Sequence, residues 1–106
     1  MARTLIKVPA KAKHGDVIEI KTLISHPMES GYRVGTNGTM IPRDIIRQFV
    51  CTYNGDDVFR AELSPAIAAN PFISFFIVAT ESGTIAFEWR GDNGFAASEN
   101  ATITVE

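Results

Sequence analysis

Apolar and polar residues alternate along most of this chain, and that period of two limits the fold more strongly than any other feature of the sequence. In the segment 16–24, Ile18 and Ile20 fall on one side of an extended chain, whereas Glu19 and Lys21 fall on the other. The same alternation recurs in four later segments, at 48–53, 57–63, 84–90 and 101–106. Each of these segments is therefore predicted to be a β-strand with one buried face.

Turn-forming residues separate the predicted strands. Asn54 and Gly55 form an Asn-Gly pair, which favours a two-residue hairpin because a type I′ turn needs positive φ at both positions. Glycine-containing turns at 81–83 and 91–94 separate the later strands in the same way. With a further strand near 4–8, the chain is predicted to be an all-β, antiparallel β-sandwich of about seven strands.

Length and composition agree with one ordinary folded domain. The 106 residues form a single domain, 1–106, of a size that folds without disulfides or metal. The net charge of −2 gives no basic surface for nucleic acid, and no apolar run reaches the roughly 18 to 20 residues that cross a bilayer. The first residues also lack the apolar core and cleavage site of a signal peptide, which by itself favours the cytoplasm.

Two regions interrupt the regular pattern of strands. Residues 25–44 form a long connection that is predicted to contain a small hairpin at 35–39. Residues 43–47 are predicted to form one weak helical turn before the next strand. The strand at 73–79 is apolar on both sides, with Phe76 and Val78 facing away from its other apolar residues, Ile73, Phe75, Ile77 and Ala79. A sandwich strand normally buries one face, so the second must be covered by the chain's own loops or by another chain.

A copper site is the first chemical possibility, because His26 and Met28 lie two residues apart on a proline-containing turn. His14 and Cys51 would complete the ligand types of a blue-copper centre. Such centres usually gather their ligands on a late loop, however, and Cys51 lies within a mid-chain strand. The spacing therefore favours an ordinary polar turn, and no metal or other cofactor is predicted.

Catalysis finds equally little support. Cys51 is the one candidate nucleophile, but its position between Phe49 and Tyr53 on a strand face favours a buried core residue over a reactive thiol. Arg43, Asp44 and Arg47 are interpreted as an exposed ion pair rather than an anion site. The remaining acidic candidates are interpreted as solvated surface, namely Asp56, Asp57 and Glu62. The sequence predicts no catalytic residues and no enzyme.

Three long strings resemble a known family: "LISHPMESG" at 23–31, "FVCTYNG" at 49–55 and "AIAANPFISFF" at 66–76. Together with the overall length and the threonine-rich last strand, they are similar to the SoxZ family over nearly the whole chain. That resemblance implies an immunoglobulin-like β-sandwich and a non-catalytic role in sulfur oxidation. The implied complex is the SoxYZ carrier, in which a cysteine near the C-terminus of SoxY holds the sulfur intermediates of thiosulfate oxidation.

The resemblance also implies partners and a location. SoxZ pairs with SoxY as a heterodimer, with higher-order assembly left open, and the complex docks transiently with periplasmic Sox enzymes. Because SoxZ is exported with its signal-bearing partner, the periplasm replaces the cytoplasm as the expected location. The interface residues predicted for this chain are Ile73, Phe75, Phe76, Val78, His26 and Met28. The alternative function is a redox or sulfur-carrying protein that uses Cys51 directly.

Overall fold

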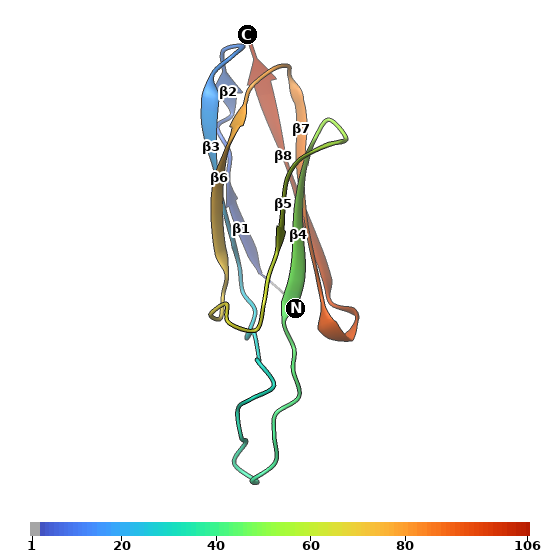
Figure 1. Ribbon diagram of the computed structural model, residues 1–106. Coiled ribbons are helices and arrows are strands. Elements are labelled where there is room, and N and C mark those ends of the chain that lie inside the picture. Colours follow the sequence, from blue (N-terminus) through green and yellow to red (C-terminus); the bar gives the residue numbers. More distant parts are fainter. Residues whose placement is uncertain (1–2) are drawn as a thin grey trace.

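Two β-sheets pack face to face in the computed structural model, which describes residues 3–106 (Figure 1). The strands in chain order are β1 (Thr4–Lys7), β2 (Lys11–Ala12), β3 (Val17–Ile24), β4 (Ile46–Tyr53), β5 (Asp56–Glu62), β6 (Phe72–Val78), β7 (Gly83–Gly91) and β8 (Ala96–Val105). One sheet has the order β1-β3-β6, and the other has the order β2-β8-β7-β4-β5. The predicted all-β sandwich is therefore confirmed.

The alternation in the sequence specifies which face of each strand is buried. Ile18, Ile20 and Ile24 on β3 point into the sandwich, as do Phe49, Cys51 and Tyr53 on β4 and Ile85, Phe87 and Trp89 on β7. The hairpin between β4 and β5 also has its predicted form, because Asn54 and Gly55 have φ of 50° and 88°. Both positive values agree with the type I′ turn expected for an Asn-Gly pair.

The structure corrects two sequence predictions and adds one strand. The helical turn expected at 43–47 is wrong, because Ile45 and Ile46 are both buried in extended backbone where β4 begins. The strand β2 was not expected; its two residues pair in parallel with β8 in an otherwise antiparallel sandwich. The last strand begins at Ala96 rather than near Ala101, because its polar first half pairs in register with β7.

Aromatic rings fill the middle of the core and join the two sheets. Phe49 on β4 contacts Phe87 and Trp89 on the neighbouring strand β7 of the same sheet. Across the sandwich, Phe59 on β5 stacks on Phe75 of β6 with ring centroids 4.2 Å apart. Since β5 and β6 are edge strands of different sheets, this stack holds the two edges together.

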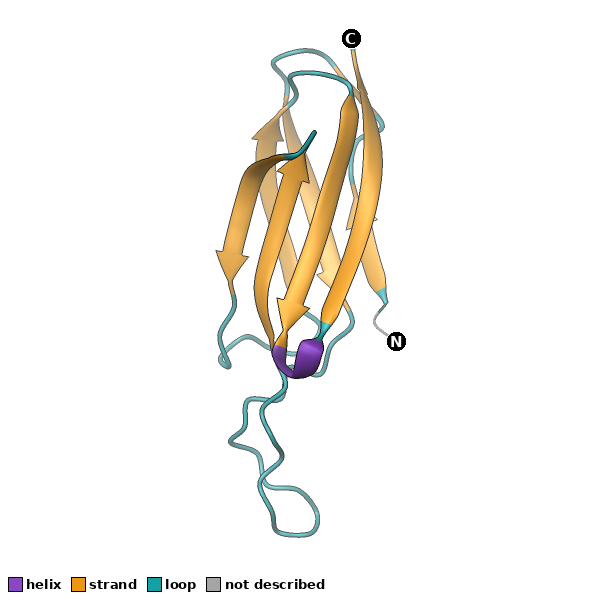
Figure 2. Cartoon of the chain, turned by 90° about the vertical axis from the view of Figure 1, so that its right-hand side faces the viewer, coloured by secondary structure: helices purple, strands orange, loops and turns teal. Residues whose placement is uncertain are grey.

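The connection between β3 and β4 projects from one end of the sandwich (Figures 1 and 2). Its two arms are joined at the base by reciprocal backbone hydrogen bonds between Glu29 and Asp44, each 2.8 Å long. Near the tip, the N–H of Gly35 donates to the carbonyl of Thr39 at 2.8 Å, which confirms the hairpin predicted at 35–39. Residues 29–44 are called the ribbon below.

In the part of the chain that the structure describes, helical structure is limited to a short 3-10 turn at Asp92–Gly94, between β7 and β8 (Figure 2). Among residues 3–106, no helix has the length and apolar character needed to span a membrane.

Candidate functional site

The outer face of the three-stranded sheet carries exposed apolar side chains along β6. Phe72, Phe76 and Val78 are 59%, 65% and 50% exposed, and they alternate with residues that point into the core. The domain's own loops therefore leave this second apolar face of β6 uncovered. Within residues 3–106, no loop of the domain covers these side chains.

Neighbouring strands extend this face. Val17 on β3 lies opposite Val78, and Leu23 lies opposite Phe72, so that each end of the face is apolar. Leu5 on β1 is exposed and lies opposite Leu23. Between the two ends, charged residues of β3 form an ion pair, Glu19 with Lys21 at 3.7 Å. We call this surface the β6 face, made of Leu5, Val17, Leu23, Phe72, Ser74, Phe76 and Val78 together with that ion pair.

The structure divides the predicted interface residues into two groups. Phe76 and Val78 lie on the β6 face. Phe75 is buried in the core, and Ile73 is half-buried on the same inner side of the strand. His26 and Met28 are also buried. Of the six residues predicted to form an interface, Phe76 and Val78 are therefore the two whose side chains are exposed in this chain.

A shallow groove runs beside this face, between the edge strands β5 and β6. Val58 of β5 and Phe76 and Val78 of β6 supply its apolar lining, while Asp56 and Glu81 supply acidic groups. Neither carboxylate forms an ion pair within residues 3–106. The groove therefore combines apolar walls with uncompensated negative charge.

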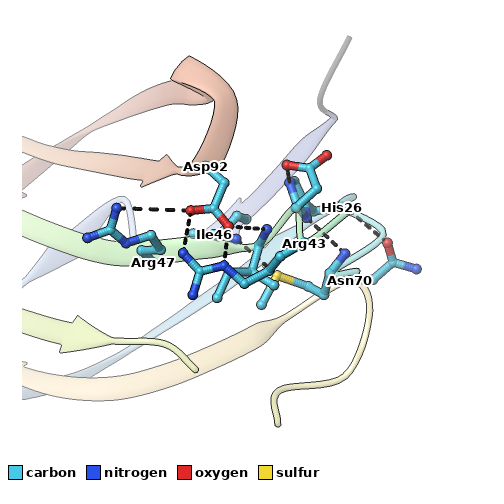
Figure 3. Close-up of polar contacts among 9 residues, drawn as sticks. His26, Arg43, Ile46, Arg47, Asn70 and Asp92 are labelled. Carbon is cyan, nitrogen blue, oxygen red and sulfur yellow. Dashed lines mark hydrogen bonds and ion pairs between the residues drawn. The ribbon is translucent and has the colours of Figure 1, made fainter. Parts of the chain in front are cut away.

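His26 and Met28 link β3, β4 and the segment before β6. The Nδ1 of His26 accepts a hydrogen bond from the N–H of Met28 at 3.0 Å, and the Met28 sulfur accepts one from the N–H of Ile46 at 3.2 Å. Asn70 pairs with both backbone groups of His26, at 3.0 and 2.8 Å (Figure 3). Because Nδ1 is an acceptor, the ring carries its proton on Nε2, which faces Asp44 at 3.8 Å. This segment has a structural role inside the domain.

Asp92 anchors the base of the ribbon. Its carboxylate accepts two hydrogen bonds from Arg43, at 2.9 and 3.0 Å, and one from the N–H of Ile45 at 3.2 Å (Figure 3). Arg47 approaches the same carboxylate at 4.0 Å. Burial alone would raise the pKa of Asp92, but the bonds from Arg43 and Ile45 and the two positive charges outweigh it and lower that pKa. These arginines do form an ion pair as expected, although Asp92 is their partner rather than Asp44.

The ribbon presents a second set of exposed apolar residues. Tyr32, Val34 and Met40 are all exposed on it. Arg33 pairs with Glu29 at the base, and the hydrogen bond from Arg33 lowers the pKa of Glu29. The ribbon is thus an exposed hairpin, and most charged side chains at its base are in ion pairs.

The structure does not assemble the candidate chemical residues. Cys51 is fully buried, and the loss of solvation raises the pKa of its thiol to about 12. His14 lies before β3 and His26 after it, at opposite ends of that strand. In the described part of the chain, no three His, Cys, Asp or Glu side chains lie close enough together to hold a metal ion.

Sequence reasoning missed several members of the β6 face, namely Leu5, Val17, Leu23 and Phe72. Phe72 precedes the strand predicted at 73–79 and directly follows Pro71, so the predicted bounds leave it out. Val17 and Leu23 lie on the same side of β3 as Glu19 and Lys21, the side that the sequence pattern marks as polar. The sequence does contain a signal for Val17 and Leu23. Because alternate residues share one side of a strand, these two apolar residues must lie at the two ends of the side that carries Glu19 and Lys21.

Comparison with known proteins gives one family and a set of similar folds. A family model described as sulphur oxidation protein SoxZ matches residues 6–102. A search of curated proteins found no match. A superoxide reductase (neelaredoxin) from Ignicoccus hospitalis superposes with a TM-score of 0.71 at 15% identity, over 97% of this chain and 80% of that one.

A second similar structure is the sulfur carrier protein SoxY from Chlorobium limicola f thiosulfatophilum. It superposes with a TM-score of 0.67 at 13% identity, over 97% of this chain and 78% of that one. At such low identity these likenesses show the fold alone. They confirm the immunoglobulin-like β-sandwich.

Proposed function

This chain belongs to the SoxZ family of sulphur oxidation proteins, and from that premise we propose that it is the non-catalytic subunit of a SoxYZ-type sulfur carrier. In this proposal it pairs with a SoxY subunit. The C-terminal cysteine of SoxY carries the sulfur intermediates of thiosulfate oxidation, and this chain provides the rigid surface on which SoxY is held.

The observation that carries the proposal is the uncovered β6 face. Phe72, Phe76 and Val78 are each half or more exposed to solvent. Exposed aromatic side chains that alternate along one strand provide the large apolar contacts that dominate the energy of many protein interfaces. The burial of such side chains against SoxY would stabilise the complex by about 25 cal/mol for each Å² of apolar surface.

The proposal assigns no covalent step to this chain. Cys51 is the one thiol present, and its raised pKa of about 12 leaves it protonated at neutral pH. A protonated, buried thiol is neither nucleophilic nor accessible to a sulfur substrate. These properties support a scaffold role over the alternative in which Cys51 carries sulfur.

The proposal includes a location and further contacts. The complex works in the periplasm, this chain is exported together with SoxY, and the assembled carrier docks transiently with Sox enzymes. Osmotic-shock fractionation of cells that express the chain with and without SoxY tests the export step. We expect periplasmic recovery only when SoxY is present, whereas cytoplasmic recovery in both strains would contradict co-export.

Co-purification tests the pairing itself. The chain is co-expressed with the SoxY subunit of the same host, only SoxY is tagged, and the mass of the eluted complex is measured by light scattering. We expect the two chains in equal numbers. If this chain stays behind as a folded monomer while SoxY elutes alone, the proposed pairing is wrong.

Two matched variants locate the contact. Phe76→Glu places a charge in the middle of the β6 face and should weaken SoxY binding by about tenfold or more. Tyr32→Glu places the same charge on an even more exposed aromatic residue of the ribbon and should leave affinity unchanged. The opposite result, with Tyr32→Glu disruptive and Phe76→Glu neutral, would move the interface from the β6 face to the ribbon.

A further inference from the structure

The strand β6 is an edge strand without the usual protection. Among residues 3–106 it pairs only with β3, and its seven residues, Phe-Ile-Ser-Phe-Phe-Ile-Val, continue in register without a bulge. Edge strands in soluble proteins are normally protected by charged residues, prolines or bulges, because their open backbone groups pair readily with another strand. β6 contains none of these features.

The register also identifies which backbone groups of β6 are open. The N–H of Ala79 donates to the carbonyl of Asp16, and the N–H of Ile24 donates to the carbonyl of Pro71. In this register, the odd-numbered residues of β6 direct their backbone N–H and C=O groups toward β3. Backbone groups alternate in direction along an antiparallel strand, so the even-numbered residues direct their N–H and C=O groups to the free edge. Those residues are Phe72, Ser74, Phe76 and Val78. No other described strand pairs with them.

The open edge and the exposed side chains therefore belong to the same residues. A strand laid along this edge would form backbone hydrogen bonds with them and place alternate side chains beside Phe76 on the β6 face. Its other side chains would enter the groove between β5 and β6, where Val58 and Val78 provide apolar walls. The acidic groups of Asp56 and Glu81 lie in the same groove and would attract a basic side chain.

We propose that the partner subunit binds by adding an extended segment to the free edge of β6, so that the three-stranded sheet continues into the partner. The added segment alternates apolar residues and carries a Lys or Arg where it passes Asp56 and Glu81. This inference rests on the proposed pairing with SoxY and specifies how that pairing is made.

Amide hydrogen exchange, measured by NMR on the chain alone and in complex with SoxY, tests the mode of binding. Strand addition should slow exchange at least tenfold at the even-numbered amides from Phe72 to Val78. The amides of Ile73, Phe75 and Ile77 already face β3 and should change little. Uniform protection of both sets, or none, would contradict strand addition.

Ser74 offers a backbone variant with a matched control. Ser74→Pro removes an N–H that faces the free edge, a position where proline is tolerated in edge strands. It should weaken SoxY binding about tenfold or more while the thermal unfolding curve stays cooperative. Ser74→Ala removes the hydroxyl but keeps the N–H, and it should bind as wild type does.

The outcomes separate failure of this inference from failure of the function. If SoxY binds the wild type and Ser74→Pro equally, pairing stands and strand addition is wrong. If SoxY binds neither, the proposed function is wrong. If the alternating protection appears without SoxY as the protein concentration rises, a second copy of this chain occupies the edge instead, which overturns the assignment to SoxY.

Discussion

Arg43 on the ribbon and Asp92 in the turn between β7 and β8 form a two-bonded ion pair, with N···O distances of 2.9 and 3.0 Å. The two residues are 49 positions apart in the sequence. The same carboxylate receives the N–H of Ile45, immediately before β4. One side chain therefore fixes the base of the ribbon to the sandwich.

Asp92→Ala is expected to lower the melting temperature and to free the base of the ribbon, because the Ile45 N–H and the Arg43 guanidinium both lose their acceptor. The measurements are thermal unfolding and amide exchange of residues 29–46. Asp57→Ala is the control, since it removes an exposed ion pair with Arg60 and should cost no more than about 0.5 kcal/mol. An equal effect of both substitutions would show that Asp92 anchors nothing.

Stability should fall in acid because of the same carboxylate. The folded state lowers the pKa of Asp92 and of Glu29, so both contributions are complete above the ordinary carboxyl pKa of about 4. They are lost as the pH falls through the lower, folded-state values. Urea unfolding between pH 2 and pH 6 measures this slope, and Asp92→Asn should make it shallower. An unchanged slope in Asp92→Asn would assign the acid sensitivity to other groups.

Cys51 should be inert in the folded protein. With a pKa of about 12, only about one thiol in 10⁵ is ionised at pH 7, and the side chain is fully buried. A thiol reagent such as DTNB should react rapidly in denaturant and very slowly without it. In the complex with SoxY, Cys51→Ala should leave sulfur transfer intact. Loss of sulfur transfer in a folded Cys51→Ala complex would instead support the alternative in which Cys51 carries sulfur directly.

His26→Ala should destabilise the domain by about 2 to 3 kcal/mol. It removes a buried ring that packs edge-on against Phe95 and leaves the N–H of Met28 without its acceptor. His14→Ala is the matched control, because that residue is exposed and should change stability by less than about 0.5 kcal/mol. Denaturant unfolding followed by the fluorescence of Trp89 measures both. Equal stability of the two variants would contradict a structural role for His26.

Tyr53→Phe tests the turn between β6 and β7. The Tyr53 hydroxyl accepts the N–H groups of Thr80 and Glu81 at 3.3 and 3.1 Å, and it donates to the carbonyl of Glu81. Removal of this hydroxyl should cost about 1 to 3 kcal/mol and speed amide exchange at the turn. Tyr32→Phe removes an exposed hydroxyl instead and should have no measurable effect. Unchanged exchange at Thr80 and Glu81 in Tyr53→Phe would show that other contacts hold the turn.

The strands that alternate clearly in sequence are the ones that sequence reasoning predicts well. β3, β4 and β7 each place apolar side chains on one side of the strand, and that pattern alone specifies their buried faces. β2 and the first half of β8 have no such pattern. Lys11 and Ala12 form a strand because β8 lies beside them, and such tertiary pairing leaves no local signal in two residues.

The site was harder to predict than the fold for a related reason. Phe75 and Phe76 are equally apolar, and only the register of β6 against β3 determines which of them faces solvent. His26 and Met28 look like polar loop residues in the sequence. They are buried in a segment that is held against the domain by Asn70, 44 positions later, which hydrogen-bonds to the backbone of His26. Contacts of that separation cannot be read from local sequence.

The projecting ribbon also changes how this molecule moves through water. The chain measures 58 × 20 × 19 Å, and its radius of gyration is 16.1 Å, against about 13 Å for a compact domain of the same length. Such an elongated monomer experiences more friction than a sphere of equal mass and elutes early from a gel-filtration column. Elution volume alone would therefore overestimate the mass of the monomer. The assembly state of this chain must be measured by a method that depends on mass and not on shape.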